Sequence, residues 1–185
     1  LYTKLGLTEK SIVDYAKKET IPVTFRNSFN TSAIIETVQS ANPSLALFKS
    51  LIETGNIGKV TKIDVKEGIE FNTTQASPFL FDPKQSGGGI LISVGIHSLD
   101  IHQYLFGDHI RLIKYCDDDL GSGWESNCQI DLDISLCGQS IPVFAEFSFS
   151  HRMPQCLRVI GSDGTAELIG PHMINLYDTK GKLKR

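Results

Sequence analysis

The chain has 185 residues, of which 41% are hydrophobic and 21% charged, so it can bury one good core. Its net charge of -3 and its lack of a basic block argue against a nucleic-acid-binding protein. No apolar run approaches the roughly 20 residues that cross a bilayer, and no signal peptide is recognisable. We therefore expect a protein that binds neither nucleic acid nor membrane.

The cysteines and histidines predict neither disulfides nor a metal centre. None of the four cysteines forms a Cys-x-x-Cys pair, and Cys128 falls in register with the apolar face of a strand. A reduced, cytoplasmic compartment is the simplest interpretation. The histidines lack metal-ligand spacing, since His97 and His102 are five residues apart and so lie on different faces of a helix.

The first part of the chain predicts two helices and a strand. A helix begins near Thr8, and a short strand follows at residues 21–25. Asn42 then caps a second helix, with Pro43 at its first position and Gly55 at its end.

Strands dominate the rest. Ile63, Val65, Ile69 and Phe71 keep a period of two, and residues 72–86 have the composition of a loop. Later runs predict strands at 128–136, 141–149, 156–160, 165–169 and 173–177. This pattern indicates an α+β fold, a large and mostly antiparallel sheet with helices packed on one face.

A triple glycine opens the most informative segment, a predicted helix that ends at Gly107. Ser93 and His97 stand four residues apart in it and should share one face. The glycines allow another group to approach the backbone and the unpaired N–H groups at the helix start. An imidazole there suits proton transfer. The alternative is a tightly packed helix in which His97 is merely hydrogen-bonded.

Residues 82–100 resemble the glycine-rich signature of the Gfo/Idh/MocA family of NAD(P)-dependent sugar and inositol oxidoreductases. The segment departs from that signature at Ser93, where the family usually has an aspartate. Residues 42–60 and 160–165 are similar to further family segments. The positions that match the signature are Asp82, Pro83, Ser86, Gly87, Gly88, Gly89, Gly95, His97 and Asp100.

The resemblance implies two parts and a longer protein. Residues 1–26 would be the last helix and strand of a Rossmann domain. Residues 27–185 would be a C-terminal domain for substrate binding and oligomerisation, with the fold of the glyceraldehyde-3-phosphate dehydrogenase C-terminal domain. The family's catalytic lysine and phosphate-binding glycine loop would precede Leu1. That missing part would bind NAD or NADP, and this chain alone would be inactive.

The resemblance also implies roles for individual residues. His97 would be the general acid/base, with Ser93 in the place of the assisting aspartate. For Asp100 we favour a structural role. The candidates for substrate binding are Arg26, Asn27, Gly88 and Lys84. The alternative for the arginine and the asparagine is an ordinary loop, and the alternative for the lysine is a solvated side chain.

Two classes of function remain open. The first is an oxidoreductase of a sugar, inositol or related polyol. The second is a non-catalytic ligand-binding or regulatory protein on the same scaffold, because Ser93 replaces the usual aspartate. Family members commonly associate through the open sheet face. Phe144, on the outer side of its predicted strand, agrees with a homo-oligomer, a dimer in the simplest case. Whether Trp124 anchors an interface stays open.

Overall fold

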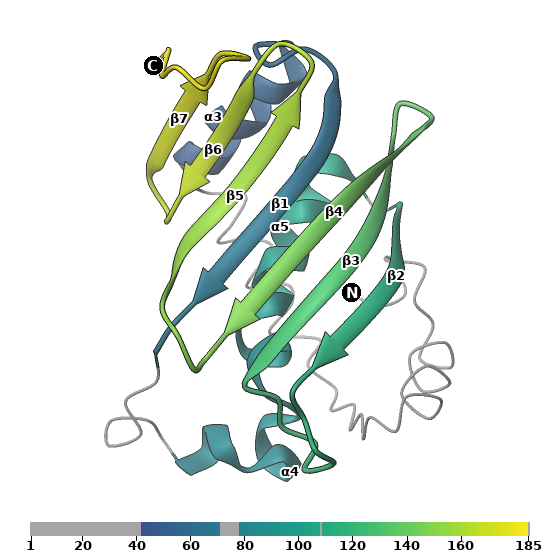
Figure 1. Cartoon of the computed structure of the whole chain (residues 1–185), viewed down its shortest axis with the longest axis vertical. Coiled ribbons are helices and arrows are strands. Elements are labelled where there is room, and N and C mark those ends of the chain that lie inside the picture. Colours follow the sequence, from purple (N-terminus) through teal and green to yellow (C-terminus); the bar gives the residue numbers. More distant parts are fainter. Residues whose placement is uncertain (1–41, 71–77, 108, 185) are drawn as a thin grey trace.

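Residues 42–70, 78–107 and 109–184 are described by a computed structural model (Figure 1). The predicted Rossmann remnant, residues 1–26, lies outside them. The helical elements are α3 (Pro43–Glu53), the 3-10 turn η1 (Pro78–Phe81), α4 (Pro83–Ser86), the π-helical turn η2 (Leu91–Gly95) and α5 (Ile96–Phe106). The strands are β1 (Val60–Gly68), β2 (Ile110–Asp117), β3 (Asn127–Leu136), β4 (Gln139–Ser148), β5 (Met153–Gly161), β6 (Thr165–Ile169) and β7 (Met173–Tyr177).

The seven strands form one sheet in the order β2-β3-β4-β1-β5-β6-β7. All neighbours are antiparallel except β1 and β4, which run parallel with Ile63 opposite Val143. The β3–β4 hairpin turns at Cys137 and Gly138, which both have positive φ, as a two-residue primed turn requires. The predicted α+β class and mostly antiparallel sheet are confirmed.

The core lies between the sheet and helices α3 and α5, which share one face (Figure 1). Alternate residues of β3 and β4 point into it, and Phe147 of β4 and Phe48 of α3 belong to the same buried cluster. Cys128 is buried there as predicted. Each such large apolar side chain stabilises the fold by about 1.5–3 kcal/mol. None of the described helices is long and apolar enough to cross a membrane.

Helix α3 begins and ends where the sequence predicts. The Asn42 side chain accepts the backbone N–H groups of Ser44 and Leu45, and Pro43 occupies the first turn. The helix ends at Glu53 with Thr54 as its C-cap, and Gly55 follows in the left-handed conformation.

Three features differ from the predictions. Strand β2 was not predicted, because a bulge between Leu112 and Lys114 interrupts its alternation. Strand β1 ends at Gly68, so Ile69 lies beyond it and is exposed. Part of the predicted loop 72–86 is helical, since Asp82 caps the short helix α4 through the backbone N–H of Lys84.

The opposite sheet face carries charged side chains in cross-strand pairs. Lys66 of β1 pairs with Glu146 of β4 at 3.1 Å. Arg158 of β5 donates to the buried Glu167 of β6 at 2.6 Å. Phe144 is the large apolar side chain in their midst, 44% exposed.

Candidate functional site

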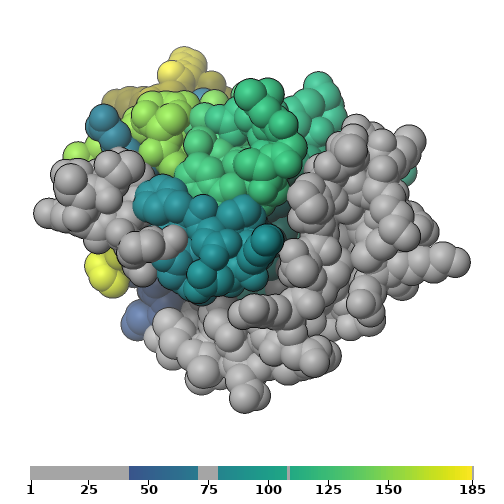
Figure 2. All heavy atoms as spheres, turned by 90° about the horizontal axis from the view of Figure 1, so that it is seen from below, coloured from purple at the N-terminus to yellow at the C-terminus, as the bar shows by residue number. Residues whose placement is uncertain are grey.

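The glycine segment lies at one end of the sheet, against the loop between β2 and β3. Figure 2 shows this end, with the teal residues that follow η1 lying directly beside green residues of that loop. Gly87 has a φ of 83° and ends α4, so the chain reverses before the next helical segment. Gly88 and Gly89 then pass beneath the loop in buried positions.

Glu125 of that loop occupies the helix start. Its carboxylate accepts the backbone N–H of Gly89 at 3.0 Å and that of Leu91 at 2.8 Å. Its backbone carbonyl accepts the N–H of Ile90 at 3.0 Å. The expectation that these N–H groups are unpaired was wrong. A group does approach the glycine backbone, and it belongs to the same chain.

Burial is the main influence on the Glu125 carboxyl group. The residue is 7% exposed, and this desolvation raises the pKa of its carboxyl group, while the N–H groups of Leu91 and Gly89 act in the opposite direction. The charge of nearby Asp117 adds to the rise of this pKa. Such a group keeps its position because its hydrogen bonds to the helix start compensate for lost hydration.

The loop that carries Glu125 is itself held on both sides. Asp118 Oδ1 accepts the backbone N–H groups of Ser126 and Asn127, both at 2.8 Å. The indole N–H of Trp124 donates to the carbonyl of Leu80 at 2.6 Å, and its ring stacks on Phe149. Trp124 therefore anchors a contact within the chain, between η1 and the residue that follows β4.

Ser93 and His97 lie along the helix that follows. The Ser93 N–H donates to the carbonyl of Gly89 at 3.1 Å. Between the two side chains the backbone forms a π-turn, in which the N–H of Ile96 reaches back to Leu91. Ser93 is half-buried and His97 is exposed, so the imidazole can be reached from solvent. Turns of this kind are frequent at functional sites.

Gly95 sets the distance between this helix and the sheet. A Cβ at this position would lie 2.6 Å from the Leu91 side chain and 3.3 Å from the ring of Phe147. The helix thus packs closely on β4 at the level of Ser93 and His97. Gly95 is one of the positions on which the family resemblance rests, and here its role is packing.

The opposite side of α5 is buried and carries polar side chains, among them Asp100 and His102. His102 is 1% exposed and its Nδ1 donates to the carbonyl of Ser98 at 2.6 Å. Burial lowers the pKa of this imidazole, so it is neutral in the core. Asp100 is also buried, which agrees with the structural role that we favoured for it. As predicted, His97 and His102 lie on different faces.

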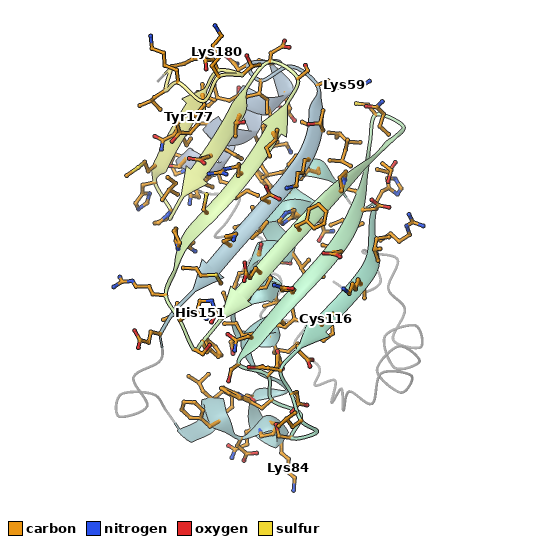
Figure 3. All side chains as sticks on the ribbon, in the orientation of Figure 1. Lys59, Lys84, Cys116, His151, Tyr177 and Lys180 are labelled. Atoms are coloured by element: carbon orange, nitrogen blue, oxygen red, sulfur yellow. The ribbon has the colours of Figure 1, made fainter. Side chains whose placement is uncertain are left out.

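Two of the remaining candidates, Lys84 and Gly88, lie among the described residues. Lys84 is exposed on α4 and points away from the domain (Figure 3). Gly88 is buried, and a Cβ there would lie 2.8 Å from the Ile92 side chain. Arg26 and Asn27 lie outside the described residues. Their assignment to substrate binding stays a prediction.

Sequence reasoning missed Glu125. A single acidic residue after Trp124 has no local pattern that distinguishes it from a solvated loop residue. Its contact with Gly89 spans 36 positions of the sequence. Among the described residues, no group of three or more histidine, cysteine or acidic side chains could hold a metal ion.

Comparison with known proteins places these observations in a family. The family model of the GFO/IDH/MocA C-terminal domain matches residues 45–167. No curated protein matches the chain in sequence.

Solved structures share the fold at low sequence identity. An inositol dehydrogenase homolog complexed with NAD+, from Azotobacter vinelandii, is 17% identical, with a TM-score of 0.66 over 76% of this chain and 39% of that one. An NAD binding oxidoreductase from Klebsiella pneumoniae is 18% identical, with a TM-score of 0.60 over 74% and 40%. Levoglucosan dehydrogenase in complex with NADH and levoglucosan is 13% identical, with a TM-score of 0.63 over 80% and 43%. The chain spans less than half the length of each of these structures.

Proposed function

Because this chain belongs to the Gfo/Idh/MocA family of oxidoreductases, we propose that it is the C-terminal domain of an NAD(P)-dependent oxidoreductase that acts on a sugar, inositol or related polyol. Structures with the same fold include one complexed with NAD+ and one with NADH and levoglucosan. The proposal concerns the whole protein, since this chain contains no Gly-x-Gly-x-x-Gly loop to bind a pyrophosphate.

The exposed imidazole of His97, on the helix that begins after the glycines, is the observation that carries this proposal. When a substrate alcohol is oxidised, its hydroxyl proton must move to a base as hydride leaves the carbon. A neutral imidazole can take that proton and return it in the reverse reaction. The nicotinamide, when bound, supplies the hydride chemistry.

The described residues of this chain do not themselves provide a nucleotide site. The helix start behind the glycines, where an anion could otherwise bind, is filled by the carboxylate of Glu125. An acidic group there would repel a phosphate. We therefore assign NAD or NADP binding to a separate nucleotide-binding domain and expect no tight NADH binding by this chain alone.

One observation favours a second candidate function. Ser93 is half-buried on the same helix as His97, in the place where the family signature has an aspartate. A serine hydroxyl can donate or accept a hydrogen bond, but it cannot stabilise an imidazolium by charge. A non-catalytic ligand-binding or regulatory protein would tolerate this replacement.

We also propose that the protein is a homo-oligomer through its open sheet face. Phe144 lies exposed on this face between cross-strand pairs such as Lys66 with Glu146. Charged pairs around an exposed aromatic side chain suit a self-complementary contact with a polar rim. The closed dimer is the simplest such assembly.

The test uses a protein in which this chain is joined to a nucleotide-binding domain. Reduction of NAD+ and NADP+ is followed with a panel of sugars, inositols and other polyols. We expect turnover with at least one of them. Ligand binding in the panel without any nicotinamide reduction would replace this proposal by the non-catalytic alternative. Calorimetric titration of the 185-residue chain with NADH tests whether this chain alone binds the cofactor. We expect no tight binding, and micromolar affinity would contradict this.

A further inference from the structure

We propose that Glu125 is a positioning residue: its carboxylate holds the backbone that begins the helix bearing Ser93 and His97, and so fixes where the imidazole stands. The consequence for catalysis rests on the function proposed above. The structural part concerns this chain alone and can be tested without turnover.

Three consecutive backbone N–H groups end on this one residue. The carboxylate takes those of Gly89 and Leu91, one on each oxygen, and the carbonyl takes that of Ile90. The first turn of a helix has no internal partners for these donors. Glu125 therefore supplies what the helix lacks at its start.

The backbones meet at the one place where a side chain is missing. A Cβ on Gly89 would overlap the Glu125 carbonyl oxygen and lie 2.6 Å from its backbone nitrogen. Any residue other than glycine would separate the loop from the helix. The absence of a side chain at Gly89 thus allows the Glu125 backbone to come this close.

The position of Glu125 is transmitted to His97 by a short, closely packed stretch. His97 lies six positions after Leu91, about 9 Å along a helix axis. Gly95, between them, leaves no room for sliding on β4, since a Cβ would already crowd Phe147. A shift at the helix start must therefore move the imidazole.

The loop behind Glu125 is fixed independently of the helix. Asp118 holds the two residues that follow Glu125, and Trp124 before it is bound to Leu80. The loop, the carboxylate and the helix therefore form one chain of contacts.

A carboxylate is needed for this geometry because both of its oxygens accept. A glutamine offers one acceptor oxygen, and its NH2 group would face an N–H donor. An aspartate is shorter by one methylene. Glu125→Gln and Glu125→Asp should each lose one of the two hydrogen bonds from the carboxylate. Neither side chain is larger than glutamate, so the domain should still fold.

The test compares these variants with Glu167→Gln, which alters a buried carboxylate on the opposite sheet face. Amide hydrogen exchange at Gly89 and Leu91 should become about 10- to 100-fold faster in the Glu125 variants, the range for a hydrogen bond to a charged group. The ring signals of His97 in carbon–proton correlation spectra should shift. Neither readout should change in Glu167→Gln.

Unchanged exchange and unchanged His97 signals in Glu125→Gln would overturn the proposal. Equal changes in the Glu167→Gln control would also overturn it, because they would indicate general destabilisation. When the chain is joined to a nucleotide-binding domain, Glu125→Gln should lower kcat at least tenfold and leave the KM for NAD(P) unchanged. An inactive wild type would contradict the proposed function, whereas the exchange and ring signals would still decide the role of Glu125.

Discussion

Glu125 and Gly89 meet backbone to backbone at the start of the helix that carries the candidate site. The Gly89 N–H donates to the Glu125 carboxylate at 3.0 Å, and the Glu125 carbonyl lies where a Cβ of residue 89 would stand. The glycine-rich segment therefore binds a loop of its own chain, the loop that carries Glu125.

Gly89→Ala should destabilise the domain strongly. The added methyl group has to push the Glu125 backbone away, and overpacking of a closed contact costs about 1–3 kcal/mol or more. Urea unfolding measures the loss. Gly138→Ala is the matched control, since its Cβ would meet open space and only the positive φ of the turn costs free energy, about 1 kcal/mol. Equal losses in the two variants would contradict the close contact.

His102 should make stability depend on pH. Its folded-state pKa is lowered by burial, so below pH of about 6.5 the unfolded chain binds a proton that the folded chain does not. The contribution of His102 to the free energy of unfolding is therefore complete above pH 6.5. It falls as the pH decreases toward the folded-state pKa, by at most about 1.4 kcal/mol per pH unit. His102→Leu should remove this part of the slope.

Denaturant unfolding at several pH values between 5 and 8 measures the slope. The same substitution at His172, which is exposed on the surface, controls for the removal of a histidine as such. A wild-type slope that persists in His102→Leu would show that other groups cause the pH dependence.

Several strands could be predicted from the sequence because their residues alternate between core and surface. Cys128 and Phe147 lie opposite each other in the β3–β4 pair, and both are buried as the alternation predicts. Strand β2 escaped prediction because its bulge places Ile113 outward, 52% exposed.

The candidate site could be predicted only where its signal is local. The glycines, Ser93 and His97 form a compact pattern, and the helix follows from it. The contact of Gly89 with Glu125 depends on tertiary packing of a distant loop. The π-turn before Ile96 has no local signal either, and it lies where Gly95 packs closely on Phe147.

Association through the open sheet face can be tested at Phe144. Phe144→Glu places a charge at the centre of the proposed interface, beside Asp64 and Asp131 on the neighbouring strands. The dimer should dissociate, with a dissociation constant raised by roughly 100-fold or more, because a buried unpaired charge is costly. Sedimentation velocity over a concentration series measures it.

Phe79→Glu provides the control for that experiment. Phe79 is similarly exposed, at 48%, but lies on η1 away from the sheet face. A dimer that survives Phe144→Glu and dissociates in Phe79→Glu would place the interface elsewhere.

The role of His97 is tested most directly by the turnover of His97→Ala in the protein that joins this chain to a nucleotide-binding domain. We expect kcat to fall by roughly 100- to 10,000-fold, the usual range for a general acid or base. Cofactor affinity should stay unchanged, because we assign nucleotide binding to the other domain. Turnover is expressed per folded molecule, with the folded fraction taken from a melting curve. Undiminished turnover in folded His97→Ala would contradict the account.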